Sequence, residues 1–203
     1  SSHKEIEEIR NKNLNFKELS VFFKDLAEKK GGEYAYGSLA KATGLGYLPL
    51  NVDTHLLGHV VGDILYKQEG TEGMKYCTRD LRNACSHSIV VGSLLEFGID
   101  KLRDVANACQ GAPGGKGAYL MCIHGLGHGV LAYAEYDMAR AIKLCENVAE
   151  PKLGNREYSE CAGGIAMEMM AGVHNKQVWE KQKINYFKKD DPLTPCNMDF
   201  MPE

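Results

Sequence analysis

The chain has 203 residues, which is enough for one compact domain with a sizeable buried core. Acidic and basic residues nearly balance at a formal net charge of −3 and are mixed along the sequence, so no basic surface for nucleic acid is expected. No apolar run reaches the roughly 20 residues that a membrane-spanning helix needs. Proline is sparse, and Ala, Leu, Met and Glu recur over long stretches, which predicts an all-α protein.

The N-terminal part, residues 1–52, is expected to form a helical cap. Its first 14 residues are charged and polar, which is typical of a frayed lead-in. Asn15, followed three residues later by Glu18, predicts a capping box that starts a helix. The glycines at 31 and 32 predict the end of that helix.

The remainder, residues 53–203, repeats a short pattern. Its units start at four positions that can be aligned: Asp53, Cys85, Cys122 and Cys161. An apolar helical segment follows each start, and the first three units reach a second cysteine 23 or 24 residues after it. The fourth unit reaches Cys196 only after 35 residues. The pattern predicts an array of about four helical hairpins within one compact domain.

The cysteine that ends one unit and the cysteine that opens the next are spaced as a disulfide pair. The predicted pairs are Cys77 with Cys85, Cys109 with Cys122, and Cys145 with Cys161. Each bond would tie the second helix of one hairpin to the first helix of the next. Disulfides persist in oxidising compartments, so an extracytoplasmic location is expected, whether secreted, periplasmic or at the cell surface. The alternative is that these cysteines are free thiols that fill a helical core.

Hairpins of this length that are cross-linked by cysteines resemble the disulfide-rich helical-hairpin repeat proteins, which are secreted relatives of the tetratricopeptide arrays. The resemblance rests on the seven residues between Cys77 and Cys85 and on the apolar first helices, and it covers residues 53–196 at the level of architecture. It implies a secreted or periplasmic helical array and no particular chemistry. By the repeat logic, the partner of Cys196 would open a fifth unit beyond Glu203; otherwise this cysteine pairs elsewhere or stays free.

Five of the seven histidines fall at two positions of the repeat. They are His55, His59, His87, His124 and His128. The first and third units each contain His-x-x-x-His, which places two imidazoles on one helix face within reach of one metal ion. If the first helices lie side by side, the histidines converge on a shared concave surface. The sequence therefore predicts a multi-histidine metal site. The structural alternative is that the histidines bond the helix starts to loops.

An imidazole-rich ligand set favours copper or zinc, with iron as a further option. Three carboxylates at nearby positions could complete the set: Asp63, four residues after His59; Glu135, seven after His128; and Glu168, seven after Cys161. The candidates for moving protons are Tyr66, Tyr133 and Glu168. His174 lies outside the repeat positions and receives no role.

Eight glycines interrupt the first helices, at a cost of about 1 kcal/mol each relative to alanine. They are Gly58, Gly62, Gly92, Gly125, Gly127, Gly129, Gly163 and Gly164. Such glycines predict that the helices pack closely or that a ligand approaches the backbone. The methionines of the fourth unit (Met167, Met169 and Met170) are expected in the core.

Two classes of function fit these patterns. The first is an extracytoplasmic metalloprotein, either a carrier or a hydrolase or oxidoreductase that activates water or dioxygen for a small molecule. The second is a disulfide-linked scaffold whose concave face binds a peptide or protein partner, with structural histidines. A third interpretation places a soft metal on Cys85-Ser-His87 and Cys122-Ile-His124. The disulfide pairing explains those cysteines better.

Overall fold

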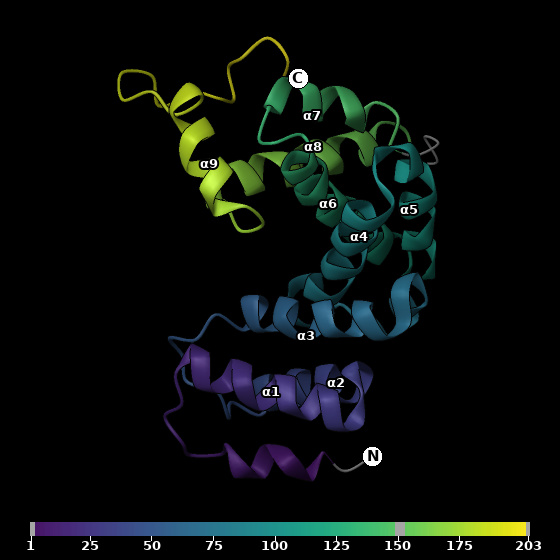
Figure 1. Cartoon of the computed structure of the whole chain (residues 1–203), viewed down its shortest axis with the longest axis vertical. Helices are drawn as coiled ribbons and strands as arrows, with labels where there is room; N and C mark the ends of the chain where they lie inside the picture. The colour runs from purple at the N-terminus through teal and green to yellow at the C-terminus, as the bar shows by residue number, and fades with distance from the viewer. Residues whose placement is uncertain (1–2, 149–152, 202–203) are drawn as a thin grey trace.

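A computed structural model describes residues 3–148 and 153–201 (Figure 1). Within these ranges the secondary structure is helical, with short 3-10 turns and no β-strand, which confirms the all-α prediction. The α-helices are α1 (Phe16–Lys30), α2 (Gly32–Gly44), α3 (Thr54–Glu69), α4 (Ala84–Phe97), α5 (Leu102–Ala108), α6 (Gly115–Tyr133), α7 (Met138–Cys145), α8 (Arg156–Ala171) and α9 (Lys176–Gln182).

The N-terminal helices form a layer beneath α3, with α1 and α2 packed on each other and on α3. The predicted capping box is present: the Glu18 N–H donates to Asn15 Oδ1 at 3.0 Å, and the Asn15 N–H donates to Glu18 Oε2 at 2.8 Å. Helix α1 ends at Gly31, whose φ of 92° suits glycine. The expected frayed lead-in is wrong for its described residues, because Lys4–Glu8 forms a 3-10 helix that buries Ile6.

Four helices form a row in which α3 packs on α4, α4 on α6, and α6 on α8. Helices α5 and α7 lie outside this row, α5 against α4 and α6, and α7 against α6 and α8. After α3 the chain forms 3-10 turns over Gly70–Tyr76 and Asp80–Asn83 instead of a second α-helix. The start of α8 follows residues 149–152, which lie outside the described part of the chain.

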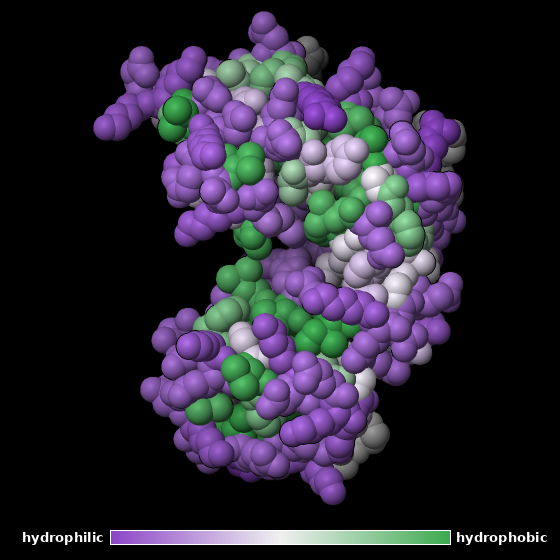
Figure 2. Space-filling view, in the orientation of Figure 1, coloured by the Kyte–Doolittle hydropathy of each residue, from purple (hydrophilic) through white to green (hydrophobic). Residues whose placement is uncertain are grey.

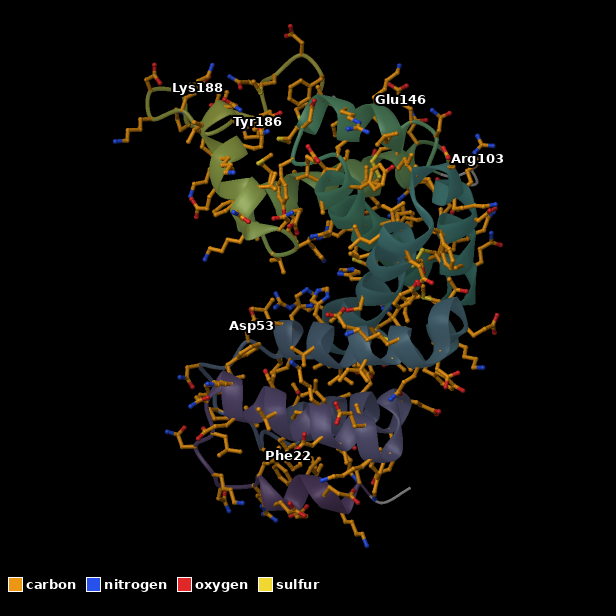
Figure 3. All side chains as sticks on the ribbon, viewed as in Figure 1. Phe22, Asp53, Arg103, Glu146, Tyr186 and Lys188 are labelled. Atoms are coloured by element: carbon orange, nitrogen blue, oxygen red, sulfur yellow. A yellow bond between two sulfur atoms is a disulfide. The ribbon has the colours of Figure 1, made fainter. Side chains whose placement is uncertain are left out.

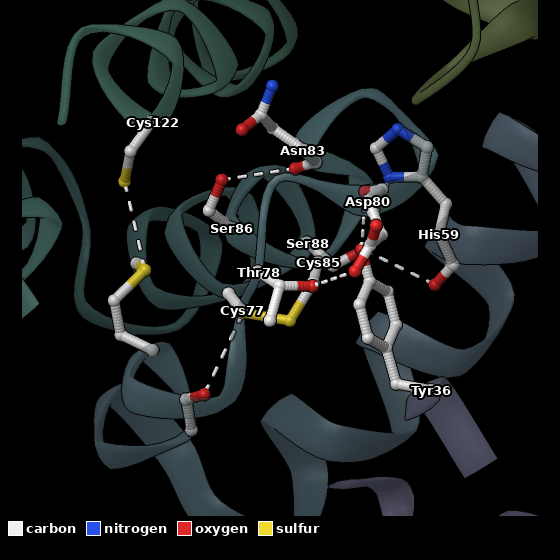
Figure 4. Close-up of a disulfide and its surroundings, with 12 residues drawn as sticks. Tyr36, His59, Cys77, Thr78, Asp80, Asn83, Cys85, Ser86, Ser88 and Cys122 are labelled. Atoms are coloured by element: carbon white, nitrogen blue, oxygen red, sulfur yellow. Dashed lines mark hydrogen bonds between the residues drawn. A yellow bond between two sulfur atoms is a disulfide. The ribbon is translucent and has the colours of Figure 1, made fainter. Parts of the chain in front are cut away.

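Three disulfides attach the segments between these four helices to α4, α6 and α8, and all three predicted pairs are confirmed. The bond between Cys77 and Cys85 ties the turns after α3 to α4 (Figure 4). The other two tie the end of α5 to α6 and the end of α7 to α8. Cys196 is exposed and carries a free thiol.

Glycine allows the closest approach in the row, at the crossing of α6 and α8. A Cβ atom built on Gly127 would lie 2.1 Å from the Cys161 carbonyl oxygen, and one on Gly164 would lie 1.9 Å from the His124 carbonyl oxygen. No other residue type fits such a contact between two backbones. The close packing predicted from the glycines is therefore present at this crossing.

The row curves, so that α3 and α9 lie on opposite sides of a hollow in the molecular surface (Figures 1 and 2). The floor of this hollow is hydrophilic in the space-filling view. Over the described residues, no helix combines the length and the apolar character that crossing a bilayer requires.

Candidate metal centre

Six imidazole side chains form one continuous cluster. They are His55 and His59 from α3, His87 from α4, His124 and His128 from α6, and His174 from the loop between α8 and α9. The centroids of neighbouring rings are 4.7 to 6.1 Å apart. Side-chain nitrogens gather between α3 and the helices above it, near Asp53, at the inner end of the hollow (Figure 3). The predicted convergence of the five repeat histidines is therefore observed, with His174 as a sixth member.

The first group of possible metal ligands is His55, His59 and His87. One ligand atom from each lies within 4.8 Å of the others. The Nε2 atoms of His55 and His59 are 3.2 Å apart, as their i, i+4 spacing on one helix face allows.

Two histidines of this group have ring nitrogens held by backbone carbonyls. His55 Nδ1 lies 2.8 Å from the Leu81 oxygen, and His87 Nε2 lies 3.0 Å from the Met121 oxygen. A carbonyl oxygen only accepts, so these two nitrogens carry the protons. The other nitrogens, His55 Nε2 and His87 Nδ1, therefore keep free lone pairs. His87 Nδ1 is buried and has no hydrogen-bond partner among the described residues.

His59 has a matching arrangement with a hydroxyl. Its Nδ1 lies 3.1 Å from Ser88 Oγ, and the Ser88 hydroxyl donates to the His59 carbonyl at 3.2 Å (Figure 4). These contacts allow two tautomers: in one, His59 Nδ1–H donates to Ser88 Oγ, and in the other, His59 Nε2–H donates to His55 Nε2, 3.2 Å away. Metal-binding histidines in proteins commonly hold their second nitrogen as in the first of these tautomers.

The second group is His128, Glu168 and His174, and again one ligand atom from each lies within 4.8 Å of the others. Glu168 is fully buried, and its Oε2 lies 3.1 Å from His128 Nδ1 and 2.9 Å from His174 Nδ1. Its Oε1 accepts from the Tyr136 hydroxyl at 2.6 Å and from the His174 backbone N–H at 3.0 Å. The Tyr136 hydroxyl in turn accepts from the Asn175 N–H at 2.9 Å.

His124 joins the two groups without belonging to either. Its ring centroid lies 6.0 Å from that of His87 and 5.3 Å from that of His128. Its Nδ1 is 3.7 Å from Glu160 Oε2, which is too long for a hydrogen bond. Its side chain is 13% exposed, so it lies at the accessible edge of the cluster.

Strained backbone flanks both groups. Leu81, Arg82 and Asn83 have φ values of 54°, 54° and 61°, and Glu135 and Tyr136 have 55° and 63°. Left-handed conformations of this kind cost about 1–2 kcal/mol for each residue other than glycine. One strained segment directs the Leu81 carbonyl to His55, and the other carries the tyrosine that binds Glu168. Strain that persists beside a cluster of polar side chains is characteristic of functional sites.

Burial favours the neutral form of four of these histidines. Loss of solvation, reinforced by neighbouring histidines, lowers the pKa of His59 to about 3 and that of His124 to about 4. Burial also lowers the pKa of His55, and it lowers that of His87 well below its ordinary value. A neutral imidazole is the form that binds a metal ion.

At the second group, Glu168 is ionised and Tyr136 is neutral. Burial acts to raise the pKa of Glu168, but the hydrogen bonds from His128 and His174 outweigh it, so the pKa lies below its ordinary value. Burial and the bond to Glu168 raise the pKa of Tyr136, which keeps its proton and donates. Glu168 is therefore a carboxylate anion that accepts from the neutral Tyr136 hydroxyl.

Gly125 on α6 leaves the space that the His87 ring occupies. A Cβ atom on Gly125 would lie 2.3 Å from the His87 ring and 2.8 Å from the His87 Cα, so only glycine at this position lets His87 approach α6 so closely. Gly163 has a looser contact, with its Cβ position 3.4 Å from His124 Nδ1.

Of the three carboxylates predicted as additional ligands, Glu168 belongs to one of the two groups found among the described residues, and Asp63 and Glu135 belong to neither. Asp63 is exposed on α3. Glu135 is exposed because α6 ends at Tyr133, so the helical spacing from His128 that motivated the prediction no longer holds.

Of the three residues predicted to transfer protons, one lies in the histidine cluster. Tyr66 packs against Gly92 and donates to Glu96, away from the histidine rings, and burial with this bond raises its pKa to about 12. Tyr133 is partly buried against the core. Glu168 is the one of the three that lies inside the cluster.

The cysteine-containing metal site is excluded, because the sulfurs of Cys85 and Cys122 are both in disulfides. The methionine prediction is correct for Met169, which is buried, and wrong for Met167 and Met170, which are 52% and 73% exposed.

Sequence reasoning missed His174 and Tyr136. Both follow the end of a helix, at Gly172 for α8 and at Ala134 for α6, so no helical periodicity links them to the other site residues. The available signal was compositional: the fourth unit lacks both repeat histidines yet contains Glu168, with a histidine six residues later.

No protein-family model, no curated protein and no solved structure matches this chain.

Proposed function

We propose that this protein binds transition-metal ions in its histidine cluster and works in an oxidising, extracytoplasmic compartment. One observation carries the proposal. In His55 and His87 one ring nitrogen donates to a backbone carbonyl, which leaves the other nitrogen with its lone pair, and His59 Nδ1 contacts Ser88 Oγ in the same way. Leaving a buried polar atom unpaired costs about 1–3 kcal/mol, and a metal ion bound to that atom would offset this cost.

The spacing within the first group suits a metal ion. Two imidazoles on a tetrahedral ion, with metal–nitrogen bonds of 2.0–2.1 Å, place their nitrogens about 3.3 Å apart. The Nε2 atoms of His55 and His59 are 3.2 Å apart. Three imidazoles with one open position form a ligand set of catalytic zinc, and imidazole also suits copper, with iron as a further option.

The second group gives the centre room for a second ion. The ring of His128 stacks on that of His87 with centroids 5.7 Å apart, and the ring centroids of His174 and His59 are 6.1 Å apart. Two neighbouring ions with open positions could activate water or dioxygen. Since the cluster lies at the hollow, a small molecule could reach it, so we favour a metal-dependent hydrolase or oxidoreductase over a carrier.

The proposed location and architecture rest on the disulfides. Three bonds among the described residues would not persist in a reducing compartment. Each bond joins the segment that follows one helix of the row to the next helix of the row, which supports a disulfide-linked array of helical repeats.

Metal content tests the proposal. The purified protein is loaded with Zn²⁺ or Cu²⁺, desalted and assayed by elemental analysis, beside His55→Ala/His59→Ala and the control His3→Ala. His3 lies outside the cluster and bonds to Ser38 Oγ. We expect one or two equivalents in the wild type, unchanged in His3→Ala and reduced by at least one in the double variant. Substoichiometric metal in every protein would refute metal binding and favour the scaffold function.

Activity assays then distinguish a hydrolase, an oxidoreductase and a metal carrier. We expect either the Zn²⁺-loaded protein to hydrolyse an activated ester or phosphodiester, or the Cu²⁺-loaded protein to consume dioxygen with ascorbate. Activity must disappear in His55→Ala/His59→Ala and persist in His3→Ala. A loaded protein that is inactive in both assays would favour a carrier.

A further inference from the structure

We propose that Glu168 is a positioning residue and not a metal ligand. It accepts the Nδ1–H groups of both His128 and His174, which leaves Nε2 of each ring to bind the ion. This inference rests on the proposed metal binding and specifies the ligand set of the second group.

One oxygen of the Glu168 carboxylate already accepts two hydrogen bonds. Glu168 Oε1 accepts from the Tyr136 hydroxyl and from the His174 backbone N–H. An oxygen with two donors has no room for a proton of its own. Because Glu168 is fully buried, these bonds also fix the orientation of the carboxyl group.

The other oxygen faces two ring nitrogens at hydrogen-bond distance, 3.1 Å for His128 Nδ1 and 2.9 Å for His174 Nδ1. Unprotonated nitrogens there would direct lone pairs at an anion. Protonated nitrogens would form two charge-assisted hydrogen bonds, which are about twice as strong as neutral ones. The geometry therefore assigns the protons of both rings to Nδ1.

This assignment explains an unsatisfied atom. His128 is 7% exposed, and its Nε2 is buried with no hydrogen-bond partner among the described residues. His87 Nδ1 is in the same state, and the two rings stack with centroids 5.7 Å apart. Two unpaired ring nitrogens on adjacent buried side chains are what metal coordination would satisfy.

The same arrangement then holds for five of the six histidines of the cluster, His124 being the exception. The outer nitrogens of His55, His59 and His87 bond to oxygens of Leu81, Ser88 and Met121, and those of His128 and His174 bond to Glu168. The metal-facing set would consist of imidazole alone, which favours copper or zinc over harder ions such as magnesium.

Nitrogen NMR of the histidines tests the assignment directly. The protein is labelled with ¹⁵N-histidine, loaded with Zn²⁺, and examined by long-range ¹H–¹⁵N correlation. We expect His128 and His174 to carry the proton on Nδ1, with Nε2 shifted by Zn²⁺. Zn²⁺ bound to Nδ1 of either ring would overturn the inference and make Glu168 a ligand, while metal binding itself would stand. An absence of Zn²⁺-dependent shifts in every histidine would overturn both proposals.

Two matched variants provide an independent test. Glu168→Gln cannot accept both N–H groups as an anion, so we expect Zn²⁺ affinity to fall 10- to 100-fold with the bound stoichiometry unchanged. Glu160→Gln, on the same helix but beyond hydrogen-bond distance of His124, should bind Zn²⁺ within twofold of the wild type. Loss of one full Zn²⁺ equivalent in a folded Glu168→Gln protein would show that Glu168 is a ligand.

Discussion

Replacing Gly164 by alanine should separate the two helices that carry the second group of the cluster. The added Cβ would lie 1.9 Å from the His124 carbonyl oxygen and 3.1 Å from the Gly127 Cα. A carbon and a carbonyl oxygen normally approach to about 3.3 Å, so α6 and α8 must move apart by about 1.4 Å. Neither obstacle is a side chain that could rotate away.

The magnitude follows from two opposing effects. Overpacking that forces backbone shifts costs about 3 kcal/mol, at the upper end of the usual range. Alanine improves helix propensity by about 1 kcal/mol relative to glycine. The free energy of unfolding should therefore fall by about 2 kcal/mol, which lowers Tm by about 4–8 °C for a protein of this size.

Gly163 is the matched control, because it is the neighbouring residue on the same helix. Its Cβ position is 3.4 Å from His124 Nδ1, which is an ordinary contact. Gly163→Ala should therefore leave the stability unchanged or raise it by up to about 1 kcal/mol.

Urea unfolding followed by circular dichroism measures both variants, with the disulfides intact. Because the shift also moves His128 on α6 away from Glu168 on α8, Gly164→Ala should bind Zn²⁺ more weakly than Gly163→Ala. Equal stability of the two variants would refute the close crossing of α6 and α8.

Three further predictions concern protonation, the buried hydroxyl and the disulfides. The metal-free protein should lose stability as pH falls from 7 to 5, because His59 and His124, with pKa values of about 3 and 4, stay neutral over this range while the same residues in the unfolded chain take up protons near their ordinary pKa. At pH 5 each of these two histidines lowers the free energy of unfolding by at most about 2 kcal/mol. A free energy of unfolding, measured with urea, that does not change with pH would contradict this prediction. Tyr136→Phe should lower the free energy of unfolding by about 1–3 kcal/mol in thermal melts, because a buried carboxylate oxygen and a backbone N–H each lose a partner; Tyr133→Phe is the control, and equal losses would argue against these bonds. Mass spectrometry after alkylation without reductant should find one free thiol, at Cys196, and reduction should cost about 2–4 kcal/mol per bond; seven alkylated cysteines would remove the case for an oxidising compartment.

Sequence pattern alone predicted the helical class, the capping box at Asn15, the three disulfides and the five repeat histidines. Each of these depends on local spacing: helix periodicity, a cap three residues from its partner, or cysteines at recurring intervals. One prediction that failed extended a helix beyond its real end. Glu135 would face the cluster only if α6 continued past Tyr133.

Tertiary packing decided the rest of the centre. His174 and Tyr136 reach Glu168 from segments that leave their helices, and α8 brings the three together across 32 and 6 residues of chain. The protons on the ring nitrogens were also beyond local pattern, because they are set by oxygens of Leu81, Ser88 and Met121 on neighbouring segments. Helical periodicity relates residues only within one element. Contacts between elements depend on how close the helices come, which at Gly127 and Gly164 is backbone against backbone.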